Sequence, residues 1–76
     1  PANTPVPAAA TGCPQGCTTA PPGCVIKGNI NVEGVKIYHV PGGGSYTATV
    51  ITPANGERWF CTDQEAQANG WRKAQN

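Results

Sequence analysis

Residues 24–40 read CVIKGNINVEGVKIYHV, and this stretch decides the fold. Two runs rich in β-branched and aromatic side chains lie on either side of a short segment, NVEG, at residues 31–34. Runs of this kind are typical of strands, and a short Asn/Gly segment between them is typical of a hairpin turn. We therefore expect strands over residues 24–30 and 35–40 that pair as an antiparallel hairpin.

Further turn and strand signals follow this hairpin. Residues 41–44 (PGGG) end the second strand, and residues 46–52 (YTATVIT) are rich in β-branched side chains, which favours a third strand. Residues 53–56 (PANG) are typical of a turn, and residues 58–61 are expected to form a short fourth strand. Strands that follow one another through short turns predict a small antiparallel β-meander of three to four strands.

A short helix is expected after the last strand. Thr62 and Glu65 have capping-box spacing, in which the hydroxyl accepts a hydrogen bond from the Glu65 N–H and the Glu65 side chain reaches back to the Thr62 N–H. Gly70 can supply the left-handed conformation that ends a helix. A helix of two turns is unstable alone, so we expect Trp71 to pin it on the sheet. The prediction is an α+β domain with one short C-terminal helix.

The N-terminal part of the chain has a different composition. Residues 1–23 contain six of the eight prolines and no charged residue. Because proline fixes φ and has no N–H group, we expect an extended arm here, followed by a domain over residues 24–76. The arm would tether the domain or contact neighbouring copies. Threonines beside proline and alanine could carry O-linked sugars, and these are Thr4, Thr11, Thr18 and Thr19.

Length and charge narrow the class of protein. A chain of 76 residues forms one domain at most and buries only ~60% of its unfolded surface, so it usually needs disulfides, a metal or partner chains. Its net charge of +1 gives no electrostatic argument for binding nucleic acid or an anionic membrane. A first residue of Pro1 fits removal of an export signal or anchor, and excision of an initiator methionine would leave the same first residue. We expect membrane attachment only through such an N-terminal anchor.

The four cysteines, Cys13, Cys17, Cys24 and Cys61, are separated by three, six and thirty-six residues. Structural zinc sites usually contain two closely spaced cysteine pairs, whereas this chain has one. We therefore expect two disulfides, and a zinc site with His39 as an extra ligand is the alternative. Of the three connectivities we favour Cys24 with Cys61, which ties the first strand to the last, and Cys13 with Cys17. Disulfides persist in oxidising compartments, which favours an exported protein.

Four motifs in the same order resemble the sunset domain, and they are IKGNI (26–30), KIYHVPG (36–42), GERWFC (56–61) and EAQANGWR (65–72). The resemblance implies a bacterial accessory unit, found behind a membrane anchor or at the C-terminus of secreted thermonuclease-like enzymes. The last motif is also distantly similar to the zinc-binding N-terminal domain of the Ada repair protein. That similarity implies cysteines at residues 41–43 and after Arg72, and this sequence has neither.

The sequence offers few candidates for catalytic residues. His39 could act as a general base if Glu57, Asp63 or Glu65 lay near it in space. Ser45 is the only serine, and no convincing nucleophile arrangement surrounds it. A domain of this size also encloses little space for a substrate. We therefore expect no enzymatic activity, no cofactor and no bound metal.

Aromatic residues give the best signal for a binding surface. Alternation along residues 57–60 (ERWF) places Arg58 and Phe60 on one face and Trp59 on the other. One face must be core, and an aromatic ring on the other face could contact sugar rings, peptide or nucleic-acid bases. The same rings could instead all belong to the core. The residues of the expected binding patch are Tyr38, His39, Tyr46, Arg58, Trp59 and Arg72.

These observations predict a non-catalytic, exported structural or interaction module of the bacterial cell envelope or extracellular space. It could self-assemble, for instance as a filament subunit, through its N-terminal arm. The expected partners are other copies of the chain or envelope components, including glycans. One alternative is an accessory nucleic-acid-binding domain of a secreted nuclease, with phosphate contacts from Lys27, Lys36, Arg58, Arg72 and Lys73. The other alternative is a small zinc-binding domain.

Overall fold

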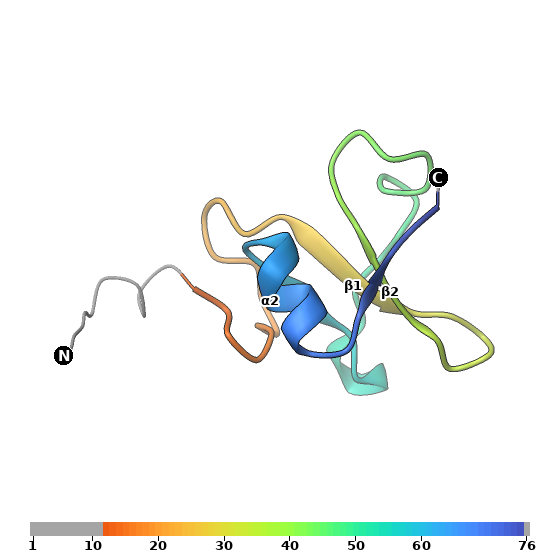
Figure 1. Cartoon of the computed structure of the whole chain (residues 1–76), viewed down its shortest axis with the longest axis horizontal. Coiled ribbons are helices and arrows are strands. Elements are labelled where there is room, and N and C mark those ends of the chain that lie inside the picture. The colour runs from red at the N-terminus through yellow and green to blue at the C-terminus, as the bar shows by residue number, and fades with distance from the viewer. Residues whose placement is uncertain (1–11, 76) are drawn as a thin grey trace, which may run out of the picture.

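The computed structural model describes residues 12–75, which form one four-stranded sheet with a short helix beside it (Figure 1). The strands lie in the order β3-β1-β2-β4. The elements are β1 (Ile26–Ile30), β2 (Lys36–His39), the 3-10 helix η1 (Pro53–Asn55), β3 (Arg58–Phe60), α2 (Asp63–Ala68) and β4 (Arg72–Lys73). The predicted α+β class with one short helix and two disulfides is confirmed. Within residues 12–75, none of the helices has the length and apolar character needed to span a membrane.

The hairpin expected from residues 24–40 is present, with strands slightly shorter than predicted. β1 and β2 pair antiparallel. The side chain of Asn31 fixes the turn, because its Oδ1 accepts hydrogen bonds of 2.9 Å from the backbone N–H groups of Glu33 and Val35. An asparagine that bonds its own downstream backbone in this way holds the turn closed.

The predicted third strand over residues 46–52 is wrong, because these residues form turns and a loop. The cause is Lys27 in β1, whose Nζ donates hydrogen bonds to the backbone carbonyls of Tyr46 at 2.8 Å and Thr49 at 2.7 Å. A backbone that curls to present two carbonyls to one ammonium group cannot also extend as a strand. The β-branched residues therefore belong to a loop over residues 41–52 that is held by Lys27.

The prediction of an all-antiparallel meander is also corrected by β4, which lies beside β2 and runs parallel to it. The N–H of Ala74 extends this pairing by donating to the carbonyl of Tyr38 at 2.9 Å. Parallel strands need a crossover connection, and the segment containing α2 supplies it between β3 and β4. The sheet is mixed, and its last strand brings Arg72 and Lys73 to an edge.

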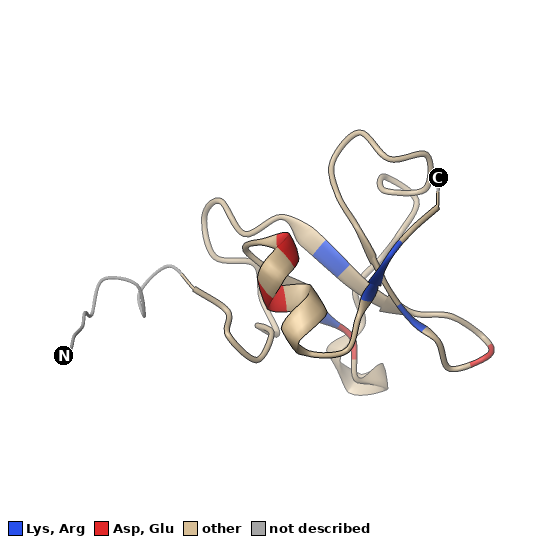
Figure 2. Cartoon of the chain, viewed as in Figure 1, with Lys and Arg blue, Asp and Glu red and all other residues tan. Residues whose placement is uncertain are grey.

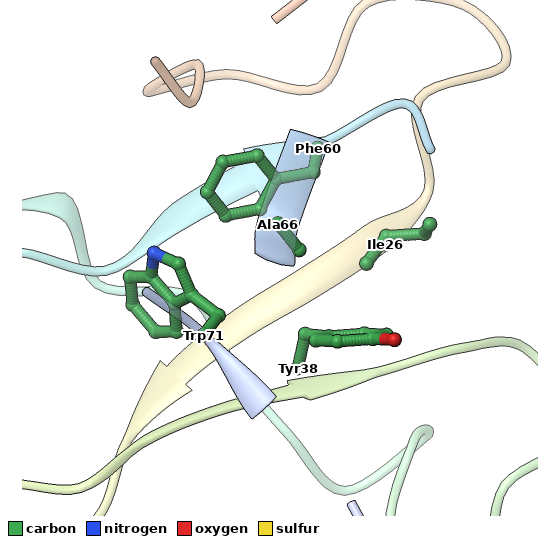
Figure 3. Close-up of a cluster of buried hydrophobic side chains, with 5 residues drawn as sticks. All are labelled: Ile26, Tyr38, Phe60, Ala66 and Trp71. Atoms are coloured by element: carbon green, nitrogen blue, oxygen red, sulfur yellow. The ribbon is translucent and has the colours of Figure 1, made fainter. Parts of the chain in front are cut away.

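One face of the sheet carries the core, whose side chains are Ile26, Tyr38, Phe60, Ala66 and Trp71 (Figure 3). The rings of Phe60 and Trp71 meet edge to face with centroids 5.7 Å apart. Gly28 allows this packing, because a Cβ there would lie 2.8 Å from the Phe60 ring and 3.2 Å from the Trp71 ring. Trp71 therefore folds back onto the sheet, as expected.

The start of α2 is capped partly as predicted. The Oγ1 of Thr62 accepts a hydrogen bond of 3.1 Å from the N–H of Glu65. The other half of the capping box differs: Glu65 accepts hydrogen bonds from the backbone N–H groups of Cys61 at 2.8 Å and Cys13 at 3.1 Å. Its carboxylate thus joins the helix to the N-terminal segment. Gly70, with φ of 86°, turns the chain after the helix.

Over residues 12–23 the structure differs from the expected extended arm. Cys13 is 1% exposed. Cys17 and Trp59 exchange two backbone hydrogen bonds of 2.9 and 2.8 Å, so this segment packs along the edge of β3. Proline limits regular strands but does not prevent single bridges of this kind. The remaining part of the predicted arm lies outside the described residues.

Candidate functional site

All four cysteines are in disulfides, and the favoured connectivity is confirmed. Cys13 pairs with Cys17, and Cys24 pairs with Cys61, with Cα–Cα distances of 5.4 and 3.8 Å. The second disulfide joins the residues just before β1 and just after β3, two neighbouring strands. These bonds point to an oxidising environment such as the extracellular space.

The three carboxylates that could have assisted His39 are engaged elsewhere. Glu57 is buried and accepts hydrogen bonds from the N–H groups of Ile30 at 2.9 Å and Thr52 at 2.8 Å. Asp63 accepts a hydrogen bond of 3.0 Å from the hydroxyl of Tyr38. The partners of Glu65 are the two cysteine N–H groups described above. Each carboxylate therefore stabilises the fold.

His39 lies in β2 and is 8% exposed. Its Nδ1 is buried and has no hydrogen-bond partner among residues 12–75. Burial, together with the positive charge of Lys27, lowers the pKa of His39 below its usual value of 6.5. The imidazole is therefore neutral at neutral pH.

Next to His39, a lysine side chain and two aromatic rings lie on the face of the sheet opposite the core. Lys27 lies between His39 and Trp59 in the strand register. Its Nζ is 4.2 Å from the centroid of the Tyr46 ring and 5.9 Å from that of Trp59. The Tyr46 hydroxyl donates a hydrogen bond of 2.7 Å to the carbonyl of Val25. The rings of Tyr46 and Trp59 thus both lie near the Lys27 ammonium group, and Tyr46 also ties the 41–52 loop to the residue before β1.

An open pocket of about 160 Å³ lies where β2 meets β4 and the residues after it. Its lining consists of Ile37, His39, Arg72, Lys73, Ala74 and Gln75. Arg72 and Lys73 are exposed. The pocket therefore combines an apolar wall, a neutral imidazole and two exposed cations, a set that suits a small anionic group.

The charges of the chain are segregated by element (Figure 2). The five cationic residues all lie on strands, whereas the four acidic residues lie on the hairpin turn, before β3 and on α2. Most of the cations have partners. Lys27 holds the 41–52 loop, Arg58 donates to the carbonyls of Pro53 and Glu57, and Lys36 lies over the Trp71 ring. Arg72 and Lys73 are the cations best placed to meet a ligand.

The structure separates the residues of the predicted binding patch. His39 and Arg72 share the pocket, whereas Tyr38 is 1% exposed and belongs to the core. Tyr46 and Trp59 lie with Lys27, and Arg58 is half-buried beside Phe60 on the core face. The glycosylation candidates Thr18 and Thr19 are exposed, and Thr4 and Thr11 lie outside the described residues.

Three residues of the pocket were not identified from the sequence, namely Ile37, Ala74 and Gln75. They come together because β4 pairs with β2, and a strand of two residues has no periodic pattern that would predict it. Lys73, by contrast, was selected from the sequence for its charge.

The chain matches no protein-family model, and comparison with curated proteins and with solved structures gives no significant match either. The resemblance to the sunset domain therefore stays a prediction.

Proposed function

We propose that this chain is an exported, non-catalytic interaction module of the bacterial cell envelope or extracellular space. It presents the β2–β4 pocket to carboxylate groups of a partner, such as an acidic envelope glycan. The part of the predicted arm that precedes the described residues, 1–11, tethers the module or engages neighbouring copies. The bacterial origin in this proposal rests on the resemblance to the sunset domain, whereas the binding site rests on the pocket itself.

The observation that carries this proposal is the pair of exposed cations at the pocket, Arg72 and Lys73. Most other charged side chains in residues 12–75 are engaged in the fold, including the carboxylates of Glu57, Asp63 and Glu65. Guanidinium and ammonium groups beside an apolar wall favour a carboxylate attached to a sugar ring or similar body. The disulfides support export, because such bonds form in oxidising compartments.

The binding proposal is tested by titrating the oxidised full chain with a uronic-acid oligosaccharide and following backbone amide shifts by NMR. The largest shifts are expected at the pocket residues 37, 39 and 72–75, and a neutral oligosaccharide of equal length should cause none. The variant Arg72→Gln/Lys73→Gln should lose the response. Lys36→Gln, which removes charge from the core face of the sheet, should keep it. Shifts that are absent, or that occur away from the pocket, would count against the proposal.

Self-assembly through the arm is tested separately. Sedimentation velocity and electron microscopy of the full chain should show concentration-dependent association, and a variant that lacks residues 1–11 should remain monomeric. If the full chain is monodisperse at all concentrations, the arm is a tether only.

Nucleic-acid binding is the second candidate, and the two exposed cations that follow each other on β4, Arg72 and Lys73, favour it. The partners of Lys27, Lys36 and Arg58 leave few cations for phosphate, so we rank it below the carboxylate site. Binding to nucleic acid should weaken steeply as salt rises. A labelled single-stranded oligonucleotide that shows no mobility change at low salt would eliminate this candidate.

A further inference from the structure

The two disulfides lie next to each other. The Sγ atoms of Cys13, Cys24 and Cys61 are all within 4.8 Å of one another, and Cys17 Sγ is bonded to Cys13 Sγ at 2.07 Å. Residues far apart in the sequence thus bring three sulfur atoms into one cluster, and Cys17 is joined to that cluster by its disulfide with Cys13. Cys13 and Cys24 are buried.

The backbone around this cluster is held by contacts other than the S–S bonds. The Glu65 carboxylate accepts hydrogen bonds from the N–H groups of both Cys13 and Cys61. Cys17 is fixed by its two backbone hydrogen bonds with Trp59, and the N–H of Cys24 donates to the carbonyl of Pro21 at 2.9 Å. In a reduced chain that keeps this fold, these contacts would still hold the four cysteines near one another, and zinc binding would supply the folding free energy that the lost disulfides had contributed.

Four thiols held this way match the needs of a structural zinc ion. Zinc takes four cysteine ligands in tetrahedral geometry at about 2.3 Å, which puts the sulfur atoms roughly 4 Å apart. The Sγ atoms of Cys13, Cys24 and Cys61 are already within 4.8 Å of one another, and breaking the S–S bonds frees the Cys17 side chain to rotate toward the fourth ligand position. Glu65 would orient two ligand-bearing residues, the role of outer-shell groups in metal sites.

We propose that the reduced chain is a zinc-binding form in which Cys13, Cys17, Cys24 and Cys61 hold one zinc ion. A dithiol or phosphine reductant supplies two electrons to each disulfide, and the two protons per disulfide come from the dithiol or from water. The four resulting thiols lose their protons when zinc binds as thiolates. A small-molecule disulfide, which accepts two electrons and is itself reduced to two thiols for each bond re-formed, reverses these steps and releases the metal. The inference is independent of the carboxylate site.

The test uses the full chain, reduced under inert gas, freed of reductant and mixed with zinc or cobalt. Native mass spectrometry should show one zinc per chain after reduction and none in the oxidised protein. Cobalt should give the intense visible bands and the sulfur-to-cobalt charge-transfer band of a tetrahedral thiolate site. The amide NMR spectrum of the reduced zinc form should be dispersed like that of the oxidised form.

Two variants separate the zinc site from unspecific binding. Glu65→Gln should weaken zinc affinity about tenfold or more without removing a ligand, whereas Glu33→Gln, at the exposed hairpin turn, should leave it unchanged. A reduced chain that takes up no zinc, an octahedral cobalt spectrum, or a collapsed NMR spectrum with zinc bound would each overturn the proposal. So would equal zinc affinity in the Glu65→Gln and Glu33→Gln variants.

Discussion

Two carboxylates that bond the backbone, one buried and one half-buried, join separate segments of this small fold. Glu57, at 5% exposure, joins the end of β1 to the chain before η1 through the N–H groups of Ile30 and Thr52. Glu65 does the same for Cys13 and Cys61. A carboxylate accepting two N–H groups satisfies donors that irregular backbone would otherwise leave unpaired. Such residues resemble catalytic acids in the sequence, and only the structure distinguishes the two roles.

The first prediction concerns Glu57. Glu57→Gln keeps the side-chain shape but turns an NH₂ group toward one of the two N–H donors, so the variant should lose about 2 to 3 kcal/mol of unfolding free energy. Urea unfolding followed by tryptophan fluorescence measures this loss. Glu33→Gln, at the exposed turn, is the matched control and should change stability by less than about 0.5 kcal/mol. Equal effects of the two substitutions would show that the buried carboxylate has no special role.

The second prediction concerns pH and His39. Because burial and Lys27 lower the pKa of His39 in the folded state, the unfolded chain binds the proton more readily. The contribution of His39 is therefore present above its unfolded pKa of 6.5 and is lost as pH falls through the folded pKa. Stability of the native chain should decrease from about pH 7.5 to about pH 5, and His39→Gln should flatten this part of the profile. Urea midpoints measured across this range decide the matter, and a variant with an unchanged slope would contradict it.

At the level of elements, the sequence predicted what depends on local pattern. The β1–β2 hairpin, the Thr62 cap and the turn at Gly70 follow from neighbouring residues and are present. The prediction of a strand over residues 46–52 failed because Lys27, which holds this segment in its turns, lies some twenty positions earlier in the sequence. β4 was missed because its strand character comes from pairing with β2. Since β4 and the two residues after it supply four of the six pocket residues, the candidate site could be predicted only in part.

The third prediction tests the role of Lys27 in holding the 41–52 loop. Lys27→Met keeps the apolar length of the side chain and removes its bonds to the carbonyls of Tyr46 and Thr49. It should cost about 1 to 2 kcal/mol and should speed hydrogen exchange of the Thr49 amide, which belongs to the loop turn. Lys73→Met removes an exposed cation and should do neither. An unchanged hydrogen-exchange rate of the Thr49 amide would show that contacts within the 41–52 loop are enough to hold its turns.

The fourth prediction tests the packing of Phe60 and Trp71 over β1. A methyl group at Gly28 would lie 2.8 Å from the Phe60 ring and 2.9 Å from the Arg58 carbonyl, so Gly28→Ala must push β3 or the core rings aside. The expected loss is about 1 to 3 kcal/mol, with a change in near-ultraviolet circular dichroism from the displaced rings. Asn29→Ala, at the next position of β1 and on the other face, should leave that spectrum unaltered. A stable Gly28→Ala variant with native ring signals would show that β1 and the core are not in such close contact.

The whole molecule is a small core closed by two disulfides, and their stabilising effects should differ. Each disulfide lowers the chain entropy of the unfolded state. By this effect Cys24–Cys61, which spans 37 positions, adds about 4 kcal/mol to the unfolding free energy, and Cys13–Cys17, which spans 4 positions, adds about 2 kcal/mol. Cys24→Ala/Cys61→Ala should therefore lower the unfolding free energy more than Cys13→Ala/Cys17→Ala. Because a domain of this size has only a few kcal/mol of stability, the first variant should be largely unfolded at physiological temperature. Thermal melts followed by circular dichroism provide the comparison.

The burial of Cys13 could make the short disulfide, rather than the long one, the more stabilising of the two. Cys13 is as deeply buried as Cys24, and the Cys13 segment is also tied to Glu65 and, through Cys17, to β3. If the short disulfide proves the costlier one to remove, contacts in the folded state outweigh loop entropy, and residues 12–23 are an integral part of the domain. A variant that lacks all four cysteines measures the energetic coupling between the two disulfides. Because the disulfides are in contact, its loss of unfolding free energy should differ from the sum of the two separate losses by more than about 0.5 kcal/mol. Strict additivity would instead mean that each disulfide stabilises its own part of the chain.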